Sequence, residues 1–131
     1  MASFIPRRLR PAAIALLASL GLAGLVGGAP RLLASDTPQA DALDAIRQVW
    51  PAEHLLSAIQ VAYKESGLTP TARGCGGDCI GLFQIHYTAN RRLIASMGIE
   101  TSEELLDPVV NSTVAYRLFR QAGWTPWSGQ P

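Results

Sequence analysis

An uncharged stretch near the N-terminus limits how much of this 131-residue chain can form a folded domain. Residues 12–29 hold no charged side chain, and Ser19 is the only polar one among them. Three arginines precede the stretch, and a basic start followed by an apolar run is typical of an export signal. As a helix the run spans about 27 Å, at the short end for a membrane crossing. We therefore expect residues 1–34 to be a signal peptide or an N-terminal membrane anchor.

This expectation places the rest of the chain outside the cytoplasm. The protein is then periplasmic or extracellular, and if the signal is retained, residues 12–29 anchor it to the membrane. No other membrane contact is expected. The exported part has roughly 97 residues, which is small for a single hydrophobic core, so a covalent cross-link would help it to fold.

The charge of the exported part excludes one class of partner. From Ser35 onward the chain carries seven basic and ten acidic residues, a net charge of −3. Nucleic-acid binding needs a basic surface, because neutralised phosphates supply most of the affinity. We therefore expect no nucleic acid as partner.

Two cysteines, Cys75 and Cys79, lie in a glycine-rich run. In an oxidising compartment this spacing predicts a disulfide, and the glycines allow the tight turn that it needs. A metal site is the rival, but His54 and His86 are the only histidines and do not follow zinc spacing. We expect a disulfide, no metal and no cofactor.

The apolar spacing predicts a mainly α domain. After Pro51, five apolar side chains follow helical spacing and predict a buried helix face that ends at Gly67. They are Leu55, Leu56, Ile59, Ala62 and Tyr63. Residues 69–85 are rich in glycine and predict a loop or a small irregular β-hairpin.

The remaining segments complete this helical domain with one β or loop insert. Asp107 and Pro108 give a helix its N-cap and its first-position proline, and Gly123 ends it. Further helices are predicted at residues 41–49 and 88–96, with a short helical turn at 102–104. We assign residues 35–50 to a linker and short helix, and residues 51–131 to the main domain.

Glu65 lies at the C-terminal end of the best-patterned helix. The negative end of the helix dipole and apolar neighbours both disfavour an ionised carboxylate there. A glycosidase acid needs that condition, because it must hold a proton for the leaving oxygen. A solvated glutamate at a helix end fits the same pattern, so this argument alone leaves the role of Glu65 open.

Other polar and aromatic side chains have two interpretations each. Gln84, between Phe83 and Ile85, fits either a cleft wall or a hairpin residue that faces water. Tyr116 fits either a cleft or the core with its hydroxyl at the edge. The tryptophans near the C-terminus fit either sugar stacking or capping of the core.

The order of these motifs is more informative than any one of them. Glu-Ser-Gly at residues 65–67 is followed by Gly-Leu-Phe-Gln-Ile at 81–85, and then by Asp-Pro-x-x-Asn at 107–111. A tyrosine follows that asparagine five residues on, and Trp-x-x-Trp-Ser closes the series. Over residues 52–128 this order resembles the soluble lytic transglycosylases of the lysozyme superfamily.

The resemblance implies an α+β lysozyme-like fold with a cleft between two lobes, and cleavage of peptidoglycan glycan strands. Glu65 matches the one catalytic glutamate, which protonates the oxygen between N-acetylmuramic acid and N-acetylglucosamine. It then takes a proton from the C6 hydroxyl, leaving a 1,6-anhydro end. The resemblance further implies four substrate-binding residues, Ser66, Gln84, Asn111 and Tyr116, the last of them near the glutamate. We expect a monomer.

Asp78 departs from this pattern, because it adds a carboxylate in the cysteine loop. If it faced the cleft, the protein could be a hydrolytic lysozyme that uses Glu65 and Asp78. A separation of about 5.5 Å would suggest a nucleophile, and one of about 6.5–9.5 Å a base that activates water. A solvated turn residue is the other interpretation. A peptidoglycan-binding module without activity also fits the sequence.

Overall fold

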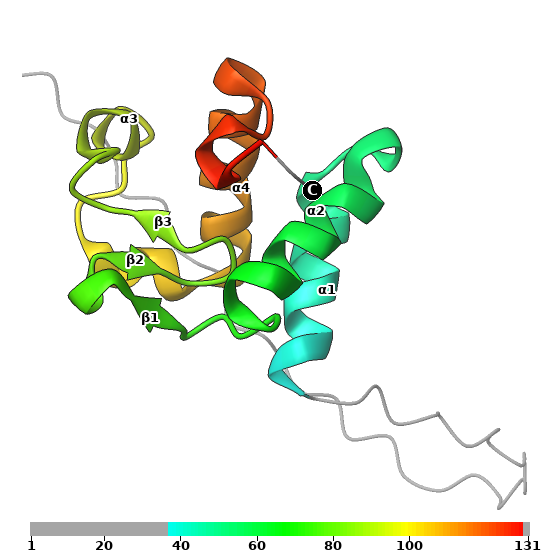
Figure 1. Ribbon diagram of the computed structural model, residues 1–131. Helices are drawn as coiled ribbons and strands as arrows, with labels where there is room; N and C mark the ends of the chain where they lie inside the picture. The colour runs from blue at the N-terminus through cyan, green and yellow to red at the C-terminus, as the bar shows by residue number, and fades with distance from the viewer. Residues whose placement is uncertain (1–36, 130–131) are drawn as a thin grey trace, which may run out of the picture. The chain divides into compact units, whose positions relative to one another are not determined.

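The computed structural model describes residues 37–129, and four α-helices and a small sheet make up this part of the chain (Figure 1). The elements follow in the order α1 (Pro38–Val49), α2 (Ala52–Ser66), β1 (Arg73–Gly74), the 3-10 helix η1 (Cys75–Gly77), β2 (Cys79–Ile80), β3 (Ile85–His86), α3 (Arg91–Ser96), the 3-10 helix η2 (Ser102–Leu106), α4 (Pro108–Ala122) and the 3-10 helix η3 (Thr125–Trp127). The expected mainly α fold with a small β insert is confirmed. The predicted signal or anchor at residues 1–34 lies outside the described residues.

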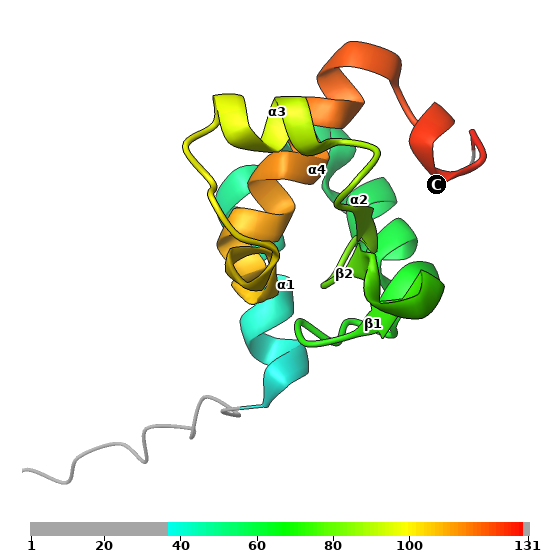
Figure 2. The ribbon, with the colours of Figure 1, turned by 90° about the vertical axis from the view of Figure 1, so that its left-hand side faces the viewer.

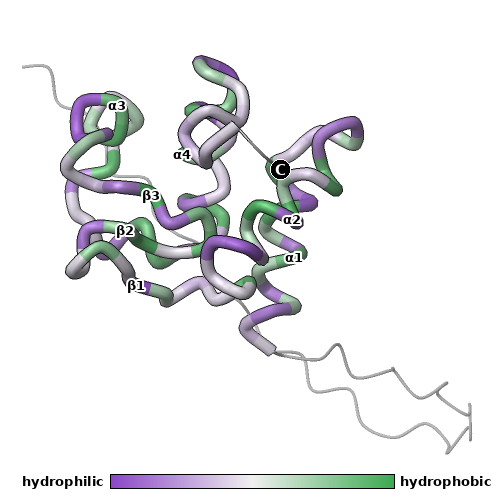
Figure 3. Tube along the Cα trace, viewed as in Figure 1, coloured by the Kyte–Doolittle hydropathy of each residue, from purple (hydrophilic) through white to green (hydrophobic). Residues whose placement is uncertain are grey.

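Helix α4 is the centre of the packing, and it contacts α1, η2, η3 and β3 (Figures 1 and 2). The side chain of Asp107 caps its first turn by accepting from the backbone N–H groups of Val109 and Val110. Its buried face carries Val114, Ala115 and Leu118. Hydrophobic residues recur between hydrophilic ones along α1, α2 and α4 (Figure 3), as helices with one buried face require.

The glycine-rich insert is a three-stranded antiparallel sheet in the order β1-β2-β3. Gly74 pairs with Cys79, and Cys79 pairs with His86 on its other side. The predicted disulfide joins Cys75 to Cys79 across a Cα–Cα distance of 5.3 Å. The small hairpin expected at residues 69–85 is therefore a sheet closed by a covalent bond at one end.

An aromatic cluster around Trp50 fills the core between α1, α2 and α4. The Trp50 ring stacks on Trp124, with centroids 5.4 Å apart, and on Phe83, at 5.6 Å. Its indole N–H donates to the buried Ser112 hydroxyl at 3.0 Å. Trp124 thus caps the core, which is one of its two interpretations from the sequence.

Two features of the predicted helices are wrong. Helix α1 begins at Pro38 and not at residue 41, because the Thr37 side chain caps it by accepting from the Ala40 N–H. On α2, Leu56 and Tyr63 are 69% and 68% exposed. The apolar spacing predicted that these two side chains are buried. Only one side of α2 contacts the core, however, and the buried residues on that side are Ala58, Val61 and Ala62.

Helix α3 also begins later than predicted, at Arg91, after a turn that follows β3. Within residues 37–129, no helix has the length and apolarity that a membrane crossing requires.

We predict that reducing the disulfide loosens the sheet more than the helices. The bond closes a very short loop, so chain entropy predicts a loss of about 2 kcal/mol or less in the free energy of unfolding. Hydrogen exchange with and without dithiothreitol should show faster exchange at Ile80 and His86 and unchanged exchange in the middle of α4. Equal acceleration in α4 would contradict this prediction.

We also predict a pH dependence that originates at η2. The backbone N–H groups of Thr101 and Glu100, together with the Thr101 hydroxyl, donate to Glu104 and hold the pKa of that carboxylate below its ordinary value of 4.5. The stabilisation is complete above pH 4.5 and is lost as the pH falls through the lowered pKa.

Melting curves of the wild type and Glu104→Gln should therefore differ at pH 7 and converge under acid conditions. Glu100→Gln is the control, because the Glu100 carboxylate makes no hydrogen bond within the described residues. A difference that persists unchanged at pH 2 would contradict the assignment.

Candidate active site

The turn that joins β2 to β3, residues 81–84, lies where three elements meet. The buried Asn111 of α4 holds it with three hydrogen bonds. The Asn111 Oδ1 accepts from the Phe83 N–H at 2.9 Å. Its Nδ2 donates to the carbonyl oxygens of Ile80 and Leu105, each at 2.8 Å. Three backbone groups of the interior are thereby satisfied by one side chain.

Gly81 is required by this arrangement. Its φ of +74° lies in the left-handed region, which disfavours residues with a Cβ. A Cβ at this position would lie 2.6 Å from the Leu105 carbonyl oxygen and would also clash with the Asn111 amide nitrogen. The close approach that Gly81 permits is therefore that of Asn111 and Leu105.

Ser66 connects the end of α2 to the same turn. Its hydroxyl lies 2.8 Å from the Leu82 carbonyl oxygen and 3.0 Å from that of Ala62, and it accepts from the Thr69 N–H. The left-handed Gly67 ends the helix directly afterwards, as the sequence predicts. The end of α2, which carries Glu65, is thus fixed beside the turn.

The Glu65 side chain is half-buried at this position. Within residues 37–129, its carboxylate makes no hydrogen bond and no ion pair. A partly buried carboxylate without a protein partner is free to exchange a proton with a bound ligand. The geometry is therefore compatible with an acid or base.

Gln84 lies at the other end of the turn, with a left-handed φ of 47°. Its Nε2 donates to the carbonyl oxygens of Ala72 and Gly81, at 3.2 and 3.0 Å. Gly74 leaves room for the amide oxygen, because a Cβ there would lie 2.6 Å from it. Both N–H groups are therefore occupied by backbone, and the amide oxygen is the group left to accept from a ligand.

Gln84 lines a hollow of about 70 Å³ that Trp127 also lines. The Trp127 indole N–H donates to the Phe83 carbonyl oxygen at 2.9 Å, so η3 is also tied to the turn. From its sequence context, Trp127 fits either a platform for a sugar ring or a cap of the core. Its contact with the turn was missed, because nothing in the Trp-x-x-Trp spacing indicates it.

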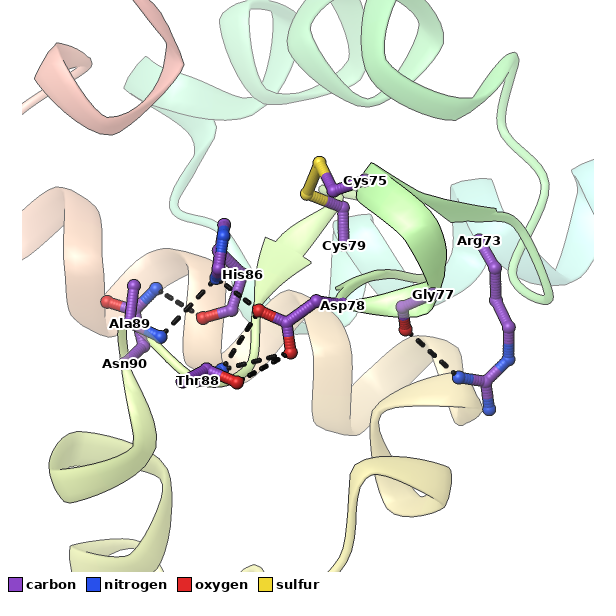
Figure 4. Close-up of polar contacts among 9 residues, drawn as sticks. All are labelled: Arg73, Cys75, Gly77, Asp78, Cys79, His86, Thr88, Ala89 and Asn90. Carbon is purple, nitrogen blue, oxygen red and sulfur yellow. Dashed lines mark hydrogen bonds and ion pairs between the residues drawn. A yellow bond between two sulfur atoms is a disulfide. The ribbon is translucent and has the colours of Figure 1, made fainter.

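The Asp78 carboxylate is bound by His86 at the end of β3 and by Thr88 just after it (Figure 4). It accepts from the Thr88 hydroxyl at 2.8 Å and from the Thr88 N–H at 3.2 Å, and lies 2.5 Å from the His86 Nδ1. The Ala89 N–H also points at this Nδ1, at 3.3 Å. One ring nitrogen cannot both donate to Asp78 and accept from Ala89, and the much shorter contact favours donation to Asp78.

Two residues that the resemblance places at the substrate have other surroundings. Asn111 has no exposed surface, so it cannot touch a glycan directly and instead positions the turn. Tyr116 packs edge-on against Trp50 at 5.0 Å and lines a larger hollow of about 440 Å³ beside α4. The structure thus brings Ser66, Gln84 and Asn111 together at the turn, whereas Tyr116 belongs to the aromatic cluster.

Within residues 37–129, no group of three or more His, Cys, Asp or Glu side chains is placed to hold a metal ion.

A profile of the Lysozyme like domain matches residues 44–129, which include the whole of the turn and every residue around it. The chain belongs to the lysozyme-like domain family. No curated protein and no solved structure matches it. Membership of this family indicates a glycosidase or transglycosylase that binds and acts on peptidoglycan.

We predict that Gly81→Ala destabilises the lysozyme-like domain far more than Gly98→Ala. Both glycines have φ values near +75°, but nothing lies within 4 Å of a Cβ at Gly98. Gly98→Ala should lower the free energy of unfolding by about 1 kcal/mol, the left-handed strain alone. Gly81→Ala should cost about 1–3 kcal/mol more through the clash with Asn111 and Leu105. Urea unfolding measures both, and equal losses would contradict the role of Gly81.

Proposed function

We propose that this lysozyme-like domain is a peptidoglycan lytic transglycosylase and that Glu65 is its acid and base. The observation that carries the proposal is a half-buried carboxylate without a protein partner at the end of α2. The next residue, Ser66, fixes that helix end to the β2–β3 turn. The same order of residues is the one that resembles the soluble lytic transglycosylases.

The proposed reaction begins with the neutral Glu65 carboxyl group. It donates its proton to the oxygen that links N-acetylmuramic acid to N-acetylglucosamine, and the bond from C1 to this oxygen breaks. The electron pair leaves with the oxygen, and positive charge develops at C1. The 2-acetamido group of the substrate stabilises that charge, so no second carboxylate is needed.

The second step returns Glu65 to its starting state. Its carboxylate now removes the proton from the C6 hydroxyl of the same muramic acid residue. The C6 oxygen bonds to C1 and closes a 1,6-anhydro ring. No water is consumed, and the proton given up in the first step is recovered in the second.

The residues around Glu65 suit this role. The hydrogen bond from Ser66 to Leu82 holds the helix end in place, which limits the movement of the acid relative to the turn. Gln84 offers its amide oxygen to a sugar hydroxyl or amide N–H, because its own N–H groups are bound to Ala72 and Gly81.

The contacts of Asp78 favour a transglycosylase over a hydrolytic lysozyme. A hydrolase would need a second carboxylate as nucleophile or as base for water. The Asp78 carboxylate is already engaged by the Thr88 hydroxyl, the Thr88 N–H and the His86 ring. These contacts tie the Asp78 side chain to β3 and to the residues just after it.

We further propose that the enzyme acts outside the cytoplasm, as a monomer. The basic and apolar pattern of residues 1–34 supports export, and the Cys75–Cys79 disulfide is typical of an oxidising compartment.

We predict that Glu65→Gln lowers turnover of purified peptidoglycan by about 100-fold or more, because the proton donor is lost. Glu53→Gln is the matched control, since Glu53 is an exposed glutamate in the first turn of the same helix, and it should keep wild-type activity. Full activity of Glu65→Gln would refute the assignment. A wild type that binds glycan without turnover would point to a binding module.

Mass spectrometry of the products separates the two chemistries. Wild type should release 1,6-anhydromuramic ends, and Asp78→Asn should release the same ends. Reducing ends that have gained water, lost in Asp78→Asn, would identify a hydrolytic lysozyme instead.

A further inference from the structure

Four exposed arginines lie on α3 and α4, two helices that Figure 2 shows near each other. Arg91 and Arg92 lie on α3, and Arg117 and Arg120 lie on α4. Within residues 37–129, none of the four guanidinium groups makes an ion pair or a hydrogen bond to another protein group. By contrast, two other exposed arginines in this range, Arg47 and Arg73, pair with acidic residues.

These arginines line two hollows that border each other. Arg117 and Arg120 line the hollow of about 440 Å³ beside Tyr116. Arg91 and Arg92 line a second hollow of about 650 Å³, and Gln121 belongs to both. We call the two hollows together the arginine groove.

The arginine groove adjoins the site described above. Its second hollow shares Asn90 and Leu118 with the small hollow that Gln84 and Trp127 line. The arginine groove and the hollow at Gln84 are therefore neighbours on the domain.

The charge of the arginine groove opposes that of the rest of the domain. Residues 37–129 contain seven basic and nine acidic side chains, yet no acidic residue occurs at 87–99 or 108–129. The four positive charges along the arginine groove repel one another and favour an anionic ligand. The Arg120 guanidinium lies 6.0 Å from the centroid of the Tyr116 ring, an arrangement that favours one orientation of this cation.

We propose that the arginine groove binds the carboxylates of the peptide stems carried by the muramic acid residues. The inference rests on the proposed function, since it takes peptidoglycan as the substrate. In stem-bearing strands the lactyl carboxyl group of each muramic acid is bound in the amide that joins the stem, so the anionic groups of the substrate are the carboxylates of its stems. Arginine suits them because its planar guanidinium donates two parallel hydrogen bonds to one carboxylate.

Binding can be measured separately from turnover by using Glu65→Gln protein. The probes are two GlcNAc–MurNAc oligomers of equal length, one with tetrapeptide stems and one from which an amidase has removed the stems and whose exposed lactyl carboxylates have then been converted to methylamides. We predict that the stem-bearing oligomer binds about tenfold or more tightly, as expected for one or more charge-assisted hydrogen bonds. Raising the salt concentration from 50 to 500 mM shortens the Debye length to about 4 Å and should remove most of this preference.

Substitutions locate the preference within the domain. Arg117→Gln with Arg120→Gln should weaken it, since only Arg91 and Arg92 then remain, while Arg117→Lys with Arg120→Lys should keep more of it, because the charge is retained. Arg47→Gln is the control for loss of an exposed arginine elsewhere. Equal binding of the two oligomers by the protein with all its arginines, or no binding of either, would overturn the inference.

The double glutamine variant is also informative on the active enzyme. Its kcat/KM should fall on stem-bearing strands and stay unchanged on stem-free strands. An equal fall on both would assign these arginines to the glycan or to the fold. If the wild type releases no 1,6-anhydro products, the proposed function is overturned, whereas the measured binding preference still holds.

Discussion

The amide of Asn111 is the contact on which the rest of the lysozyme-like domain depends. It reaches from α4 to the Phe83 N–H and to the carbonyl oxygens of Ile80 and Leu105, all in the interior. Each of these backbone groups would be costly to bury without a partner. One side chain therefore fixes the positions of α4, the β2–β3 turn and η2 relative to one another.

The β2–β3 turn collects further segments by the same means. Ser66 binds the Leu82 carbonyl oxygen from α2, and Trp127 binds that of Phe83 from η3. The groups proposed to meet the glycan, Glu65 and Gln84, are adjacent in sequence to these anchoring points. Their positions therefore follow from backbone hydrogen bonds that lie beneath the surface, which is how a protein holds a reactive group on a small domain.

Glu65, Asp78 and the arginine groove differ in whether their charged groups have protein partners. Glu65 has no protein partner in the described part of the chain, whereas Asp78 is engaged by Thr88 and His86. This difference, more than the presence of two carboxylates, supports acid and base chemistry at one residue. Four arginines without an ion pair in the described part of the chain line the arginine groove, where the domain, otherwise acidic, offers a positive surface to the substrate.

Features encoded by neighbouring residues could be predicted from the sequence by itself. Asp107 caps α4, Gly67 ends α2, and Cys75 bonds to Cys79, because each depends on residues within a few positions of it. Only the tertiary structure decided the burial of Asn111, the exposure of Tyr63 and the gathering of the arginines. Periodicity shows that a helix has an apolar side, but which part of that side meets another element depends on partners some 30 or more residues away.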